Sequence, residues 1–193
     1  MKPLQMPMFS PETEWIPPTH LPDLKDHKEI AIDLETRDPG LKSSGSGSVN
    51  GNGEVVGIAV AVEGWSGYFP IAHEGGGNMD RALVLDWFEE VLHTDATKIF
   101  HNAMYDVSWI RSMGFYIRGG VIDTLIAASL IDENRWGYAL NALGKQYVGV
   151  GKNEKILNDA AKSWGIDPKA DMWRLPAPLV GEYAEQDAVL TLR

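Results

Sequence analysis

Acidic residues at several places in the sequence have the types and spacing that metal-dependent chemistry requires. Asp33 and Glu35 alternate with apolar residues in the stretch IAIDLET, so in a β-strand both acidic side chains point to one face. Their bases would lie about 5–7 Å apart, and like charges at that distance repel each other. Taken alone, the pair is explained by a solvated strand face, so its interpretation depends on the other acids.

Asp187 lies in a helix predicted over residues 177–193, four residues after Tyr183. Residues four apart share a helix face, and Val180, Ala184 and Leu190 fall on or beside that face. The carboxylate is therefore embedded in an apolar stripe, where an unpaired charge is costly. Either a structural hydrogen bond to a buried neighbour or a bound cation would offset this cost.

A further acid follows a short strand predicted over residues 97–101. Asp106 lies in the first turns of the next helix, near the carboxyl edge of the sheet, where open α/β sheets place ligands. The alternative is an acid stabilised only by the helix dipole, with Asn102 as an N-cap. Asp123 follows another short strand, and we expect it to order the strand–helix turn.

Divalent cations would allow several carboxylates to lie together, because carboxylate oxygens suit hard ions such as Mg²⁺ or Mn²⁺. The histidines show no zinc-binding spacing, and the chain has no cysteine. No Gly-x-Ser-x-Gly segment supports serine-based hydrolysis. The pattern therefore indicates two-metal phosphoryl transfer.

The composition is that of a globular domain, since the 193 residues are 44% hydrophobic and 23% charged. No apolar run is long enough to span a membrane, and no secretory signal is visible. The net charge of −10 is opposite to that of most proteins that bind nucleic acid over a wide surface. If nucleic acid is the ligand, we expect local, metal-assisted binding or another domain that supplies positive charge.

Three predicted strands, followed by alternating helices and strands, favour an α/β fold with a mixed sheet flanked by helices. Residues 1–28 are rich in proline and predict an extended arm, with Trp15 and Ile16 as anchors. The Gly/Ser/Asn-rich residues 42–54 predict a flexible loop. Strands are predicted over residues 29–34, 55–64, 65–72 and 97–101, helices over 79–93, 103–113, 138–148, 154–164 and 177–193, and a strand running into a helix over 120–132.

Three segments together resemble the exonuclease motifs of the DEDD superfamily, in the subgroup with tyrosine in the third motif. They are DLET (33–36), HNAMYD (101–106) and YAEQD (183–187). More specifically, the chain resembles the 3′–5′ proofreading domain of family A DNA polymerases, the DNA polymerase I type. YFPIAH, IDT and LNALGKQYV support this resemblance over residues 29–193, and DPGL and HEGGGN resemble phage-encoded members.

The resemblance implies an RNase H-like fold with a five-stranded mixed sheet whose first three strands are antiparallel. It also implies that Asp33 bridges two Mg²⁺ or Mn²⁺ ions, that Glu35 and Asp187 complete the first site, and that Asp106 holds the second ion. Tyr183 would orient the attacking water together with Glu35. The implied contacts to the substrate strand come from Thr36, Leu41, Asn102 and Tyr105, with Leu41 as a wedge against the terminal bases.

The function that the resemblance implies is removal of nucleotides from single-stranded DNA 3′ ends. We expect a monomeric exonuclease domain over residues 29–193, a polymerase domain in the same full-length chain, and a cytoplasmic location in a bacterial or phage-infected cell. One alternative is a standalone exoribonuclease similar to RNase D. A second alternative is a catalytically silent structural domain of a polymerase, although the four acids and the tyrosine are all present.

Overall fold

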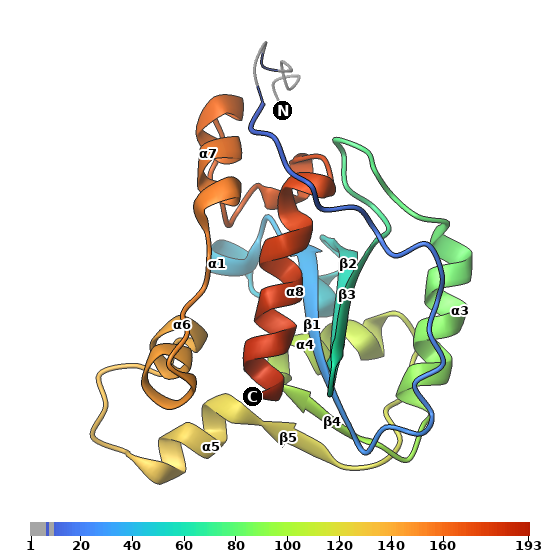
Figure 1. The fold of residues 1–193 in the computed structure, drawn as a ribbon, viewed down its shortest axis with the longest axis vertical. Helices are drawn as coiled ribbons and strands as arrows, with labels where there is room; N and C mark the ends of the chain where they lie inside the picture. The colour runs from blue at the N-terminus through green and yellow to red at the C-terminus, as the bar shows by residue number, and fades with distance from the viewer. Residues whose placement is uncertain (1–6, 8–9) are drawn as a thin grey trace.

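The computed structural model describes residue 7 and residues 10–193, and its centre is a five-stranded mixed sheet (Figure 1). The strand order is β3-β2-β1-β4-β5. β1, β2 and β3 are antiparallel neighbours, whereas β4 lies parallel to both β1 and β5. This is the mixed α/β sheet that the sequence predicts. The strands are β1 (Glu29–Arg37), β2 (Glu54–Val62), β3 (Trp65–Pro70), β4 (Thr97–Phe100) and β5 (Val121–Asp123).

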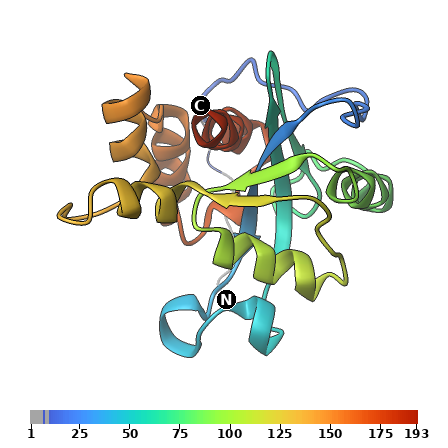
Figure 2. The same ribbon diagram turned by 90° about the horizontal axis from the view of Figure 1, so that it is seen from below.

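Helices cover both faces of the sheet, with α8 on one side and α3 and α4 on the other (Figure 2). No helix in the described part of the chain is long and apolar enough to cross a membrane. The helices are α1 (Leu41–Ser44), α2 (Gly47–Asn50), α3 (Arg81–Leu92), α4 (Ala103–Ser112), α5 (Thr124–Ile131), α6 (Leu140–Leu143), α7 (Lys155–Trp164) and α8 (Pro178–Leu192), with a π-helical turn η1 (Gly144–Val148) and a 3₁₀ turn η2 (Met172–Arg174).

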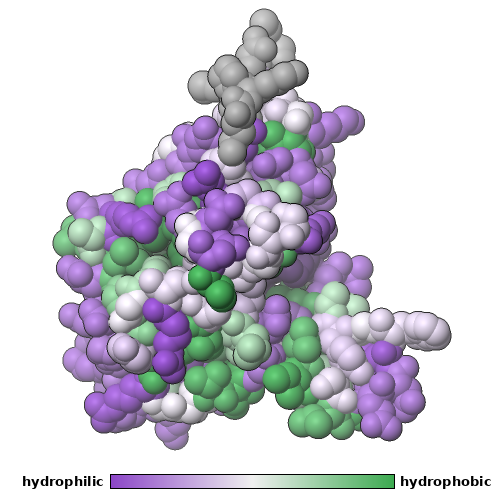
Figure 3. Space-filling model, turned by 180° about the vertical axis from the view of Figure 1, so that it is seen from behind, coloured by the Kyte–Doolittle hydropathy of each residue, from purple (hydrophilic) through white to green (hydrophobic). Residues whose placement is uncertain are grey.

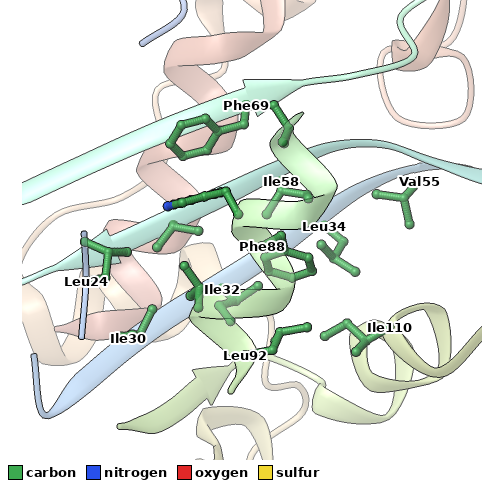
Figure 4. Packing of buried hydrophobic residues seen from close by; sticks show 14 of the residues in the cluster. Leu24, Ile30, Ile32, Leu34, Val55, Ile58, Phe69, Phe88, Leu92 and Ile110 are labelled. Atoms are coloured by element: carbon green, nitrogen blue, oxygen red, sulfur yellow. The ribbon is translucent and has the colours of Figure 1, made fainter. Parts of the chain in front are cut away.

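The alternation in β1 divides the core into two parts, as the sequence predicts. Ile32 and Leu34 pack with Phe88 of α3 and Ile110 of α4 (Figure 4). Residues of opposite parity face α8, where small buried side chains line the contact between sheet and helix. Short side chains allow close approach of the helix backbone to the sheet. The alanines in this second cluster are Ala31, Ala59, Ala61, Ala160, Ala184 and Ala188.

The segment before β1 lies along the sheet and helix surface. Trp15 packs so closely on α8 that a Cβ at Gly181 would lie 2.2 Å from its ring. Its indole nitrogen donates to Oε1 of Glu185 at 2.7 Å. Trp15 is therefore an anchor, as predicted. The prediction for Ile16 is wrong, because that side chain is 72% exposed, and the buried Leu24 joins the core instead. Residues 1–6 and 8–9 of the predicted arm lie outside the described residues.

The predicted flexible loop over residues 42–54 instead contains the short helices α1 and α2. Oδ1 of Asp38 accepts a hydrogen bond from the Gly47 amide at 3.0 Å, and Trp109 lies against Gly47 and Gly53. Ser48 bonds to Ser108 of α4 at 2.7 Å. The prediction failed because glycine-rich composition reports intrinsic freedom, whereas these glycines provide space for a tryptophan ring.

A buried lysine holds the turn that precedes β4. Lys98 is fully buried, and its ammonium donates to the backbone oxygens of Thr94, Ala96 and Arg118. We expect Lys98→Met to lower the free energy of unfolding by about 2–4 kcal/mol, because these carbonyls lose their donor. Urea denaturation measures this effect. The exposed Lys28 provides a control, and an equal loss in Lys28→Met would contradict the assignment.

Candidate active site

Three carboxylates meet where α8 crosses β1. Asp33 and Glu35 come from β1 and Asp187 from α8, and one carboxylate oxygen of each lies within 4.8 Å of the others. Glu35 and Asp187 are buried, with exposed fractions of 7% and 4%, and Asp33 is partly buried. Oxygen-only donor sets of this kind suit Mg²⁺ or Mn²⁺. The structure thus brings together three of the predicted metal ligands.

The strand pairing explains why Asp33 and Glu35 lie beyond the end of the parallel neighbour of β1. The pairing of β1 with β4 ends at Ala31, opposite Ile99, whereas its pairing with β2 continues past a bulge between Glu35 and Thr36. β1 therefore extends beyond its shorter parallel neighbour, and the expected strand over residues 29–34 is three residues longer in the structure. The two acids lie on this extension, near the carboxyl edge at which Asp106 is predicted.

Burial and mutual repulsion favour the protonated forms of these acids. Burial, followed by the charge of Asp187, raises the pKa of Asp33 to about 7. Burial, followed by the charge of Asp33, raises the pKa of Glu35 well above its ordinary value. Burial also raises the pKa of Asp187. A bound cation would offset the repulsion between the carboxylates and favour their charged forms, so this group of acids suits a cation.

Asp106, on α4, lies next to this group. Its Oδ1 accepts a hydrogen bond from the Leu34 amide at 3.0 Å, an amide beyond the last residue of β1 that pairs with β4. Asp106 is 4% exposed, and burial, followed by the charge of Asp33, raises its pKa well above the ordinary value. Its oxygens are not among those within 4.8 Å of one another. The fourth acid is therefore adjacent to Asp33 without joining the three-carboxylate group.

Tyr183 lies one helical turn before Asp187 and is 8% exposed. Burial, together with the nearby charge of Glu35, raises the pKa of its hydroxyl, so the group remains neutral. The predicted inward face of α8 is confirmed, because Val180, Ala184 and Leu190 are all buried.

A residue not predicted from the sequence is Lys152, whose Nζ lies 2.6 Å from Oδ2 of Asp187. Nothing in the spacing of Lys152 marks it, since it lies in a connection between η1 and α7. Oδ1 of Asp187, by contrast, is buried without a hydrogen-bond partner in the described part of the chain. A buried carboxylate oxygen without a donor is costly, and a metal ion would satisfy it. The residues present therefore fit a divalent ion.

The predicted substrate-contacting residues come from β1, from α1, and from α4 with the residue before it. The hydroxyls of Thr36 and Tyr105 are 2.6 Å apart, and Tyr105 also donates to Oδ2 of Asp38 at 3.1 Å. These bonds tie α4 to the end of β1. Leu41 is the first residue of α1 and is 45% exposed, so its side chain is available for contact.

Asn102 has a left-handed backbone with φ of 70° and makes no side-chain cap to α4. The N-cap alternative is therefore wrong for its side chain, and the exposed amide remains free of that role. Asp123 instead accepts from the Asn102 amide at 3.0 Å and from the Ala103 amide at 2.8 Å. It also caps α5 through the Leu125 amide. Its predicted role in the strand–helix turn is confirmed.

The fold is RNase H-like. A crystal structure of Trypanosoma brucei RNase D has a TM-score of 0.63 at 17% identity, covering 88% of this chain and 56% of that one. Brucella melitensis NrnC with bound Mg²⁺ has a TM-score of 0.57 at 19% identity, covering 91% and 73%. At these identities the likeness shows the fold.

Sequence similarity identifies the family. The 3′–5′ exonuclease family matches residues 16–193, and the chain belongs to this family, as its motifs predict. A DNA-directed DNA polymerase of Pseudomonas phage M6 is 38% identical over 98% of this chain, and DNA polymerase DpoZ of Salmonella phage PMBT28 is 28% identical over 89%. DNA polymerase I of Borreliella burgdorferi is 25% identical over 88%. The chain spans only 30%, 26% and 17% of the length of these relatives.

Proposed function

We propose that this domain removes nucleotides from single-stranded DNA 3′ ends by two-metal-ion phosphodiester hydrolysis, as the proofreading part of a DNA polymerase. The observation that carries the proposal is the group of Asp33, Glu35 and Asp187, whose oxygens lie within 4.8 Å of one another in a chain of the 3′–5′ exonuclease family. The phage relatives named as DNA polymerases support DNA as the substrate.

The proposed ligands divide between two ions, Mg²⁺ or Mn²⁺. Asp33, Glu35 and Asp187 would hold the first, and Asp33 and Asp106 the second. When bound, the ions supply positive charge that offsets the phosphate and makes water a better nucleophile near neutral pH. The unpartnered Oδ1 of Asp187 and the raised pKa values of Asp33 and Glu35 support this assignment.

Tyr183 and Glu35 are the proposed residues that orient the attacking water. The Tyr183 hydroxyl keeps its proton because burial raises its pKa, so it acts as a hydrogen-bonding group rather than as a base. A Glu35 carboxylate, with the ions present, accepts a hydrogen bond from the same water. Two fixed partners restrict the direction of attack, which lowers the entropic part of the barrier.

The proposed substrate contacts come from Thr36, Leu41, Asn102 and Tyr105. Leu41 would wedge against a terminal base, since its side chain is 45% exposed. Asn102 is exposed, and its backbone amide donates to Asp123. Thr36 and Tyr105 are joined by their hydroxyls and would define the edge along which the strand enters.

The proposed partner is a polymerase domain in the same full-length protein, with residues 29–193 as a monomeric exonuclease domain after the N-terminal arm. Such a domain would supply the positive charge that this chain, at −10, lacks for a wide grip on DNA. Figure 3 shows hydrophobic surface at the lower edge of the molecule. The exposed apolar side chains of α5 are Ile126, Leu130 and Ile131, and such side chains suit contact with a further domain. The proposed location is the cytoplasm of a bacterial or phage-infected cell.

The test uses one single-stranded oligonucleotide sequence, made as DNA and as RNA with a 5′ label. We expect the 193-residue chain with Mn²⁺ or Mg²⁺ to shorten the DNA stepwise from its 3′ end, because the family hydrolyses strands in that direction. Gel electrophoresis of the labelled products measures this. Faster shortening of the RNA would instead favour an exoribonuclease similar to RNase D. A chain that binds the DNA but releases no nucleotide would be a silent structural domain.

A further inference from the structure

Lys152 is a basic side chain that enters the group of acids. Its Nζ lies 2.6 Å from Oδ2 of Asp187, and it also donates to the Tyr183 hydroxyl at 3.4 Å. The same ammonium lies 5.1 Å from the centre of the Tyr183 ring. Because the Lys152 side chain is only 12% exposed, its charge is held among the acids rather than in solvent. This is an unusual environment for a lysine in an ordinary surface connection.

The backbone around Lys152 is held from two helices. The Lys152 amide donates to Oδ1 of Asn141 in α6 at 3.0 Å, and Gln186 of α8 donates to the Gly151 carbonyl at 3.2 Å. A Cβ at Gly151 would lie 2.7 Å from the same Asn141 oxygen, so the segment passes close to α6. Lys152 therefore reaches the acids from a fixed backbone position. Its side chain loses less conformational entropy when it pairs with Asp187.

The two oxygens of Asp187 differ in their contacts. Oδ2 accepts from Lys152, whereas the buried Oδ1 has no partner among the described residues. A carboxylate can serve two cations through its two oxygens. The ammonium thus leaves Oδ1 available for a metal ion and fixes the plane of the carboxylate. Residues that hydrogen-bond a metal ligand without binding the metal orient that ligand and affect the reaction at the metal.

In the hydrogen bond between Lys152 and Tyr183, only Lys152 can be the donor. An ammonium group donates hydrogen bonds and cannot accept them, so the Tyr183 oxygen is the acceptor. The hydroxyl proton of Tyr183 must then point away from Lys152. Lys152 therefore determines both the orientation of a proposed metal ligand and the orientation of the hydroxyl proposed to hold the attacking water.

We propose that Lys152 is a positioning residue for strand hydrolysis, acting through Asp187 and Tyr183. The inference rests on the proposed function, because it assigns Lys152 to that same reaction. It differs from two other roles for a lysine in this position. A lysine that only grips the DNA phosphates would affect KM, and a lysine that only preserves the metal site would affect metal affinity.

The test compares Lys152→Met with Lys152→Arg and with Lys155→Met, in which an exposed lysine of the neighbouring α7 is replaced. With single-stranded DNA and saturating Mn²⁺, we expect Lys152→Met to lower kcat by about 10–100-fold, the range for partners behind a metal ligand. KM should stay within about threefold of the wild type. Lys152→Arg should recover part of kcat because it keeps the charge, and Lys155→Met should match the wild type.

A second measurement is Mn²⁺ binding by calorimetry, which does not depend on turnover. Lys152→Met removes a positive charge beside Asp187, so we expect Mn²⁺ to bind at least as tightly as to the wild type. Weaker Mn²⁺ binding would overturn the proposal in favour of a role in preserving the metal site. A raised KM with an unchanged kcat would overturn it in favour of phosphate binding. If Lys152→Met fails to fold in circular dichroism, Lys152→Gln replaces it in both measurements.

A double-mutant cycle with Tyr183→Phe tests whether Lys152 acts on kcat through the Tyr183 hydroxyl. Because Lys152 acts partly through the Tyr183 hydroxyl, the double variant should lose less kcat than the product of the two single losses, by at least about threefold. Independent losses would overturn this path. A wild-type chain without activity on DNA or RNA would refute the proposed function, and the inference with it. An active wild type with an equally active Lys152→Met would refute the inference alone.

Discussion

Replacing both Asp33 and Glu35 by alanine should reduce nucleotide release from single-stranded DNA by at least about 10³-fold, because bound ions contribute several kcal/mol to catalysis. The two side chains supply two of the three carboxylates that lie within 4.8 Å of one another. The fold should survive, since both residues repel charged neighbours in the metal-free state. Initial rates with Mn²⁺ and a 5′-labelled oligonucleotide measure the loss.

The control for this variant removes two acids elsewhere. Asp86 and Glu90 lie four residues apart on α3 and are exposed, so replacing both by alanine changes the net charge equally. We expect that variant to keep the wild-type rate within about twofold, because isolated surface changes have small effects. If the Asp33/Glu35 double variant kept its activity and melted well below the wild type, the pair would be structural rather than catalytic.

The metal-free chain should lose thermal stability as the pH rises from about 5 to about 8, because its buried acids then lose protons. Burial raises the pKa of Asp33 from 3.8 to about 7, so the folded state keeps a proton that the unfolded state has already released. The stability contributed by this protonation is complete below the unfolded pKa and disappears as the pH passes about 7. Glu35 and Asp106 shift in the same direction.

Adding Mn²⁺ at about pH 8 should raise the melting temperature by about 5 °C or more, since a ligand that binds only the folded state stabilises it. Thermal unfolding followed by circular dichroism, with EDTA or Mn²⁺ at each pH, measures both effects. The double variant Asp33→Ala/Glu35→Ala should show a smaller fall with pH and little response to Mn²⁺. A wild type whose melting temperature rises between these pH values in EDTA would contradict the assignment of buried acids.

The parts of the fold that the sequence predicts are those governed by local periodicity. Alternation in β1 placed Ile32 and Leu34 on one face and Asp33 and Glu35 on the other, and the clusters confirm this division. The helices predicted over residues 79–93 and 177–193 are α3 and α8 in the structure. Residue spacing carries this information because a strand and a helix repeat at different periods.

Contacts between distant segments escaped the sequence analysis because no local pattern records them. Lys152 pairs with Asp187, which is 35 positions away in the sequence, and nothing in its own neighbourhood distinguishes it. Trp15 anchors the N-terminal segment through Glu185, 170 positions away. The glycines over residues 42–54 similarly indicate flexibility in the sequence, whereas in the structure Trp109 packs against two of them. In each case the partner is brought close only by the folded chain.

The family, the α/β architecture and the identities of the acids follow from the amino-acid sequence, because motif spacing and side-chain periodicity are local properties of the chain. How those acids meet depends on the tertiary structure. It joined Asp33 and Glu35 to Asp187, placed Asp106 against the Leu34 amide and added Lys152. The physical reason is that mutual distance and burial set the electrostatics of the site, and both arise when α8 packs across β1.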